Sequence, residues 1–337
     1  MNTKRCIITF ISLTLLVVVI ALISVSVGSA GISVREVLDT ITGRSDDMMN
    51  NSIIMNIRLP RIIAAILLGG GLALSGYMLQ TFFNNPIVGP FVLGISSSAK
   101  LTVALAMIYL LGLGKNISSA GMVSAAFVGA LIAMAFVLII SVRVKNMGIL
   151  VVCGIMIGYI CSAVTDFVVT FADDSNIVNL HNWSMGSLSG MNWQDIRIMA
   201  VIILICFAAA FLCSKPIGTY RLGESYASSM GVNIKALRVT LILISSMLAA
   251  SVTAFAGPIS FVGIAVPHLV GGLIKTSEPK VMIPGVFLGG AVVTLLCDAI
   301  ARTVFAPTEV SISSVTAVLL VPVVIFIMLK RRDAGRR

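Results

Sequence analysis

Few residues that could do chemistry lie within the apolar stretches of this sequence. The ionisable ones are Lys100, Asp166, His268 and Asp298. Ionisable groups inside an apolar membrane segment are costly, so each is a functional candidate by default. The carboxyls of Asp166 and Asp298 could carry protons in a gradient-driven transporter, although structural or cavity-lining roles suit their positions near segment ends better. His181 and His268 are too isolated to suggest a metal site, so no metal is expected and each is predicted to be a hydrogen-bonded packing residue.

No catalytic or nucleotide-binding motif accompanies these residues. Lys275-Thr276 lacks the preceding glycines of a phosphate-binding loop, and neither HExxH nor GxSxG occurs. A membrane-embedded enzyme therefore has no visible catalytic set, and no enzyme activity is expected. Transport driven by ATP would need a separate ATPase, with ATP and Mg²⁺ bound there, and no cofactor is expected on this chain.

The composition indicates a membrane protein. Hydrophobic residues make up 58% of the 337 positions, charged residues only 11%, and mean hydropathy is +1.09. A soluble domain of this length would keep a larger polar surface. Since one crossing takes roughly 20 apolar residues, we predict an all-α polytopic protein with about ten spans. The six cysteines lie in or beside these spans without a CxxC pair, so they are expected to pack as small hydrophobes.

The apolar stretches predict ten spans within one transmembrane domain, residues 1–337. They cover about residues 6–28, 58–83, 91–113, 119–142, 148–172, 196–213, 239–256, 259–274, 282–301 and 311–329. The first is longer than the core of a secretory signal, roughly 7–15 residues, and is expected to be retained. Glycines at 69–71 and 76 predict close helix packing. The eighth span is expected to be short and broken at Pro267-His268.

Basic residues orient this topology. With both termini in the cytosol, sixteen of the 23 Lys and Arg lie on or near the cytosolic side and seven lie outside, which satisfies the positive-inside rule. Topology thus explains the net charge of +10, and without a cluster of basic and aromatic residues no nucleic-acid partner is expected.

The polar stretch 215–238 interrupts the apolar pattern on the predicted cytosolic side. Within it, Gly223 to Met230 could form two helical turns, closed by Gly231 in a left-handed cap. A short surface helix between spans suggests a docking element for a cytosolic protein. An ordinary loop is the alternative.

Three arginines, Arg58, Arg61 and Arg302, fall on the predicted outer face. Arg58 and Arg61 are three residues apart and share a helix face. Cations there oppose the topological bias, which suggests an anionic partner. The alternative is that they snorkel or pair locally. Asp298, four residues before Arg302, could form such a local ion pair with it.

Several motifs occur in a fixed order along about residues 50–330. They are Arg58-Leu59-Pro60-Arg61; Leu74-Ser75-Gly76 through Gln80 to Asn85-Pro86; Leu93-Gly94-Ile95-Ser96-Ser97; Trp183-x2-Gly186-Ser187-Leu188-Ser189-Gly190-x2-Trp193; Leu222-Gly223-Glu224 to Met230-Gly231-Val232-Asn233; Gly257-Pro258-Ile259-x-Phe261-Val262-Gly263-x3-Pro267-His268; and Asp298-x3-Arg302 through Ala306-Pro307-x-Glu309. Together they resemble the permease subunits of type II ABC importers, the family that handles iron-siderophores, haem and cobalamin. One such motif is weak, whereas this many in family order are highly specific.

The resemblance implies a fold of ten spans per subunit, a homodimer in the bilayer of the cytoplasmic membrane, two cytosolic ABC ATPases and an extracytoplasmic substrate-binding protein. It assigns residues 223–233 to paired short helices that contact the ATPase. The implied coupling residues are Leu222, Gly223, Glu224, Ser228, Met230, Gly231, Val232 and Asn233. It matches Arg58, Arg61 and Arg302 to arginines that meet acidic residues of the binding protein. Spans 148–172 and 311–329 would line the passage, with Asp166 on it and an inner gate at Asn146, Met147 and Gly148.

Some positions depart from the family pattern. Gly89 stands where an acidic residue is usual, Gly271-Gly272 where an arginine is usual, and Lys100 where a small residue is usual. These departures cluster on the predicted cytosolic side and bear on its details.

We therefore predict the membrane subunit of an ATP-driven importer of a metal chelate. Iron-siderophore is the commonest cargo in the family, while haem and cobalamin stay open because the binding protein sets selectivity. The alternative from another class is a secondary transporter that uses Asp166 or Asp298 for protons.

Overall fold

The computed structural model describes residues 3–26, 34–41, 47–112, 118–144, 147–306 and 308–334, and over these ranges the chain is helical without a strand. Seven of the described helices are long and apolar enough to cross a membrane, and three shorter apolar helices accompany them. Seven and three make ten, so each predicted span has a helix. The prediction of an all-α polytopic fold is confirmed.

The structure has long apolar helices joined by short helical segments. They are α1 (Thr3–Ser26), α2 (Val34–Ile41), α3 (Met48–Ser52), the π-helix η1 (Ile53–Arg58), α4 (Leu59–Phe83), the 3₁₀ helix η2 (Pro90–Leu93), α5 (Ile95–Gly112), α6 (Ser119–Arg143), α7 (Met147–Val169), α8 (Asp174–Ser184), α9 (Trp193–Leu212), α10 (Ser214–Tyr220), α11 (Glu224–Ser229), α12 (Ile234–Ala256), α13 (Val262–Ile274), α14 (Pro279–Thr303) and α15 (Ile312–Ala334).

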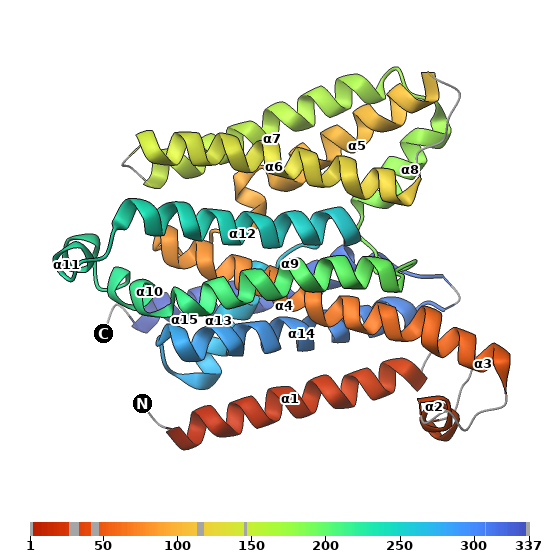
Figure 1. The fold of residues 1–337 in the computed structure, drawn as a ribbon, viewed down its shortest axis with the longest axis horizontal. Coiled ribbons are helices and arrows are strands. Elements are labelled where there is room, and N and C mark those ends of the chain that lie inside the picture. Colours follow the sequence, from red (N-terminus) through yellow and green to blue (C-terminus); the bar gives the residue numbers. More distant parts are fainter. Residues whose placement is uncertain are drawn as a thin grey trace.

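The long helices run side by side along the long axis of the molecule (Figure 1). α1 begins and α15 ends at the same end of the bundle as α10 and α11, which we call the loop end. α2, α3 and α8 lie at the opposite end (Figure 1). This agrees with an even number of spans. α5, α6 and α7 form a layer above α12, and α1 covers α14 on the far side (Figure 1).

α4 is the central helix of the bundle, and its glycines allow close approach of its neighbours. A side chain at Gly69 would overlap Thr294 of α14, and one at Gly76 would overlap the carbonyl oxygen of Gly263 in α13. Helices in a membrane associate largely through close van der Waals packing, which small residues permit. The packing predicted for these glycines is confirmed.

The expected break at Pro267 is wrong, since α13 runs through it from Val262 to Ile274. Proline has no N–H to donate to the carbonyl four residues earlier, here that of Gly263. The side-chain amide of Gln80 in α4 donates to this oxygen at 3.3 Å and to the Ile264 carbonyl oxygen at 3.1 Å. A neighbouring helix thus satisfies the group that proline frees, as apolar surroundings require.

Two helices begin earlier than hydropathy predicted. The helical stretch of the second span starts at Met48, because Asp47 caps it by accepting from the N–H groups of Met49 and Asn50. α12 starts at Ile234, capped by the side chain of Asn233, which accepts from the Ala236 N–H. Polar residues near these starts are N-caps rather than loop residues. All six cysteines are free, and four of them are buried, as expected of small hydrophobes.

Candidate functional site: the coupling loop

Two short helices, α10 and α11, project from the loop end between α9 and α12 (Figure 1). Gly231 has φ of +83°, a left-handed conformation that glycine adopts without strain. Its N–H donates to the Ser228 carbonyl oxygen at 3.0 Å, and the Val232 N–H donates to that of Ala227 at 3.0 Å. The predicted short helix with a glycine cap is confirmed. The helix pair, however, is α10 with α11 and starts at Ser214, earlier than the implied 223–233.

The outward side of this helix pair is exposed and partly apolar. Ala227 is fully buried and anchors α11, whereas Leu222 is 70% exposed and Met230 is 61% exposed. The other implied coupling residues Gly223, Glu224, Ser228, Gly231 and Asn233 are exposed, and Val232 is half-buried. Exposed large apolar side chains beside polar ones are typical of a protein contact surface.

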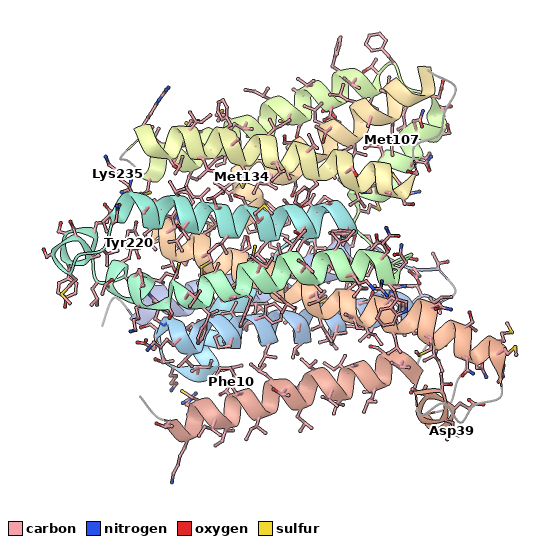
Figure 2. All side chains as sticks on the ribbon, in the orientation of Figure 1. Phe10, Asp39, Met107, Met134, Tyr220 and Lys235 are labelled. Atoms are coloured by element: carbon pink, nitrogen blue, oxygen red, sulfur yellow. The ribbon has the colours of Figure 1, made fainter. Side chains whose placement is uncertain are left out.

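Side-chain bonds tie this loop to three parts of the bundle. Tyr220, at the base of the loop in Figure 2, places its hydroxyl 3.2 Å from the Phe82 carbonyl oxygen at the end of α4. Arg221 donates to the Ser277 carbonyl oxygen before α14 at 2.7 Å. Glu224 of α11 pairs with Arg238 of α12 at 2.6 Å. These bonds attach α10 and α11 to α4, α12 and the turn before α14.

Tyr220 donates from a protected position. Its hydroxyl also lies 2.9 Å from Glu224 Oε1, so the proton is shared between two acceptors. Burial raises the pKa of Tyr220 above its ordinary value, and the hydrogen bond to Glu224 raises it further. The hydroxyl keeps its proton at neutral pH and acts as a donor.

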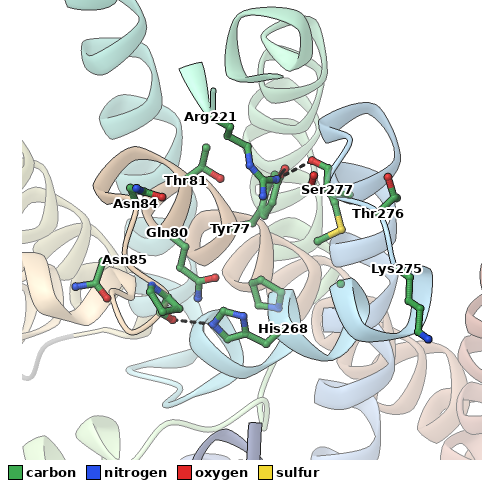
Figure 3. Close-up of a pocket in the computed structure, with 14 residues that line it drawn as sticks. Tyr77, Gln80, Thr81, Asn84, Asn85, Arg221, His268, Lys275, Thr276 and Ser277 are labelled. Carbon is green, nitrogen blue, oxygen red and sulfur yellow. Dashed lines mark hydrogen bonds between the residues drawn. The ribbon is translucent and has the colours of Figure 1, made fainter. Parts of the chain in front are cut away.

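A polar hollow of about 450 Å³ lies beneath the loop (Figure 3), between the ends of α4 and α13 and the turn before α14. Arg221 reaches across it to Ser277, and the His268 ring nitrogen Nε2 lies 2.8 Å from the Pro86 carbonyl oxygen. His268 is a hydrogen-bonded packing residue, as expected. His181, in contrast, is exposed on α8, so its predicted packing role is wrong.

Two of the positions that depart from the family pattern, Gly271 and Gly89, have different surroundings. Gly271 lies on the wall of the polar hollow, and an added Cβ there would have only Met282 in ordinary contact at 3.6 Å. The position is open enough for a long side chain. At Gly89, an added Cβ would crowd Ile264 at 2.8 Å. The absence of an acidic residue at Gly89 thus fits the packing against α13.

The three arginines lie at the opposite end, which we call the arginine end, and they are turned into the protein. Arg58 and Arg61 are only 5% and 8% exposed. Arg61 pairs with Asp298 at 2.9 Å and with Glu309 at 2.9 Å, and Arg302 pairs with Asp298 at 3.3 Å. The local pairing left open from the sequence is confirmed. Their docking role stays a prediction, while Glu309, with its side chain 44% exposed, is the accessible member.

Two of these arginines, Arg58 and Arg302, hold α1 in place. Arg58 donates to the carbonyl oxygens of Val25 and Ser26, and Arg302 donates to that of Ser24 at 3.1 Å. The last carbonyl groups of a helix have no intrahelical donor. The arginines satisfy these groups at the end of α1 and bind the helix to α4 and α14.

The predicted passage residues lie on α7. Met147 and Gly148 stand at its start, Asp166 is exposed near its end, and Asn146 lies outside the described residues. Only 11% of the most apolar stretch of α7 is buried inside the protein. Tyr159 of α7 and Val318 of α15 are 69% and 74% exposed. The two helices expected to line the passage thus present uncovered apolar faces, and their passage role stays a prediction.

A helical bundle with an exposed, tethered helix pair at one end has the features of a membrane transport permease. The chain belongs to the FecCD transport family, whose model matches residues 15–330. It is a permease of the type II ABC importer class.

Known proteins support this assignment along almost the whole chain. The chain is 32% identical over 322 residues to the hemin transport system permease protein HmuU of Yersinia pestis, covering 95% of each protein. It is 33% identical over 324 residues to the vitamin B12 import system permease protein BtuC of Salmonella typhi, covering 95% of this chain and 94% of BtuC.

Solved structures agree with the fold. One, an inward-facing "metal-chelate type ABC transporter", superposes with a TM-score of 0.84 at 30% identity, covering 96% of this chain and 99% of that chain. PsaBC from Streptococcus pneumoniae, at 16% identity and a TM-score of 0.55, shares the fold alone, covering 86% of this chain and 95% of that chain.

Proposed function

We propose that this chain is the permease subunit of an ATP-driven importer of a metal chelate, with iron-siderophore as the cargo. Hemin, vitamin B12 and metal chelates are named for its relatives and structural neighbour. Haem and cobalamin are the alternative cargoes for the same machinery. The observation that carries the proposal is the exposed α10–α11 pair, bonded to α4, α12 and the turn before α14.

The proposed machine has further parts. Two copies of this chain face each other in the cytoplasmic membrane with their termini in the cytosol, and one ABC ATPase docks on each α10–α11 pair. An extracytoplasmic binding protein delivers the chelate at the arginine end. ATP binding closes the ATPase pair and moves α10 and α11. Because lipid-facing backbone must stay hydrogen-bonded within helices, whole helices tilt and the passage opens to one side at a time.

The proton-coupled alternative loses one of its two candidate carboxyls. Asp298 is 1% exposed and bonded to Arg61 and Arg302, which favours a structural role over proton transfer. Asp166, exposed on α7, is the candidate that this alternative keeps.

Transport in sealed vesicles tests the proposal. The chain is co-purified with its ATPase and binding protein, and the bound ligand is identified by mass spectrometry. We expect an iron chelate, with uptake that needs ATP and persists when the proton gradient is collapsed. Uptake that needs the gradient but no nucleotide would refute the proposal, and bound haem or cobalamin would correct the cargo.

A further inference from the structure

A second hollow, of about 710 Å³, lies at the loop end between the end of α6, α11 and the start of α12. Three basic side chains line it: Arg143 from the last turn of α6, and Lys235 and Arg238 from the start of α12. Lys235 lies at the end of α12 nearest α11 in Figure 2. The hollow is separate from the polar hollow under Arg221, with which it shares no lining residue.

The charges around this hollow are unbalanced. Glu224 is the acidic residue on its wall, and it is engaged by Arg238 at 2.6 Å. Within the described part of the chain, Arg143 and Lys235 form no ion pair. Two positive charges therefore face the hollow without a counter-charge from those residues, which favours an anionic ligand.

Arg238 provides a second, independent indication. Its Nε–H is buried and has no hydrogen-bond acceptor among the described residues, although its Nη2 is bonded to Glu224. A buried N–H without an acceptor is destabilising and rare in folded proteins. Because Nε itself has almost no accessible surface, an oxygen of a ligand in the hollow would accept from it only after the Arg238 side chain rotates.

The surface of α6 beside the hollow indicates what kind of anion fits. Val128, Ile132, Phe136 and Ile139, spaced three or four residues apart, form a stripe whose members are 50–58% exposed. Residues at this spacing share one helix face. Arg143 continues the stripe four residues after Ile139 and opens into the hollow. An apolar line that ends at a basic hollow matches an acyl chain joined to a phosphate group.

We propose that this hollow binds the phosphate group of an anionic phospholipid, whose acyl chain lies along the α6 stripe. The inference rests on the proposed function only for the orientation, which puts the hollow at the cytosolic surface of the membrane. A bare acidic side chain of a protein partner would neutralise the cations but leave the stripe uncovered. Since Arg238 holds Glu224 of α11, a bound lipid would stiffen the junction between the coupling loop and α12.

Native mass spectrometry of the detergent-purified full chain tests this. The lipids are phosphatidylglycerol and phosphatidylcholine with identical acyl chains, which share the phosphate diester and differ in net charge. We expect phosphatidylglycerol to bind at least tenfold more tightly than phosphatidylcholine, because two cations without an ion-pair partner among the described residues lie near its headgroup. Equal affinity for the two lipids would overturn the proposal, and this comparison requires no variant.

Paired variants locate the site. Arg143→Gln with Lys235→Gln should remove the preference for phosphatidylglycerol, whereas Lys215→Gln with Lys280→Gln, two exposed cations elsewhere at the loop end, should keep it. Equal loss in both pairs would overturn the assignment to this hollow. Inorganic phosphate is the third ligand tested. If it raised the thermal unfolding midpoint as much as phosphatidylglycerol does, the hollow would be a site for free phosphate and the lipid proposal would be overturned. Lipid binding is measured without ATP, so transport without an ATPase would refute the proposed function and leave this result standing.

Discussion

The two ends of the bundle hold their charged residues in opposite ways. At the arginine end, Asp298 and Arg302 have side chains only 2% and 9% exposed, and they bind residues from distant parts of the chain. At the loop end, Glu224 is 45% exposed and is held by one ion pair with Arg238 and a hydrogen bond from Tyr220. Breaking a buried pair costs far more than breaking an exposed one. The arginine end therefore holds helices together, while the loop end presents an exposed surface that fewer buried bonds restrain.

The largest expected effect comes from removing the central carboxylate of the arginine end. Asp298→Asn leaves Arg61 and Arg302 buried without their shared counter-charge, at a cost of about 3–5 kcal/mol. We expect a sharp fall in the thermal unfolding midpoint in detergent. Glu224→Gln at the loop end is the matched control, and it should lower that midpoint far less. Equal losses at the two ends would break the comparison.

The next effect tests whether the loop end works as a moving part. Gly231→Ala forces a side chain into a left-handed conformation, at a cost of about 1–2 kcal/mol confined to the end of α11. We expect ATP hydrolysis to continue while cargo uptake per ATP falls severalfold. Gly218→Ala, inside α10 with ordinary contacts at 3.7 Å, is the control. Normal coupling in the Gly231 variant would count strongly against the proposed role of α11.

A milder change distinguishes the side-chain bonds that hold α10 and α11 from the exposed surface of these helices. Arg221→Gln removes the charged donor to the Ser277 carbonyl oxygen, a bond to a charged group worth roughly 1.5–3 kcal/mol where it is shielded and less at this exposed site. We expect the ATPase to bind with unchanged affinity and uptake per ATP to fall by less than in the Gly231 variant. Loss of ATPase binding would show instead that Arg221 belongs to the contact surface.

The smallest expected effect concerns docking at the arginine end. Charge reversal by Arg58→Glu with Arg61→Glu would be a suitable test if both residues were exposed. Because both are buried, it would disrupt the packing of the helices as well as any docking. Glu309→Gln instead frees one side of Arg61 while leaving Asp298 in place. If Arg61 meets acidic residues of the binding protein, the affinity should rise about two- to fivefold at low salt and less at high salt, because salt screens exposed charges. An unchanged affinity would refute the docking role of Arg61.

Much of the fold was accessible from local patterns. Apolar length predicted a helix for each span, and the glycines at 69–71 and 76 indicated where helices pack closely. Helix starts were less accessible, because the side chains of Asp47 and Asn233 cap helices in stretches that read as loop. The continuity of α13 through Pro267 was not predictable from local sequence. The compensating donor is the side chain of Gln80, which lies 183 residues before Gly263 in the chain.

The sequence by itself determined the number of apolar helices and the glycine cap of α11. It also determined that both termini lie at the same end of the bundle as the polar loop. These features depend on hydropathy and on backbone preferences of neighbouring residues, which are local. Tertiary structure decided that the arginines turn inward, because Arg61 and its partner Asp298 are 237 residues apart. It also decided that α6, α11 and α12 enclose a basic hollow, since only packing brings charges from separate helices together.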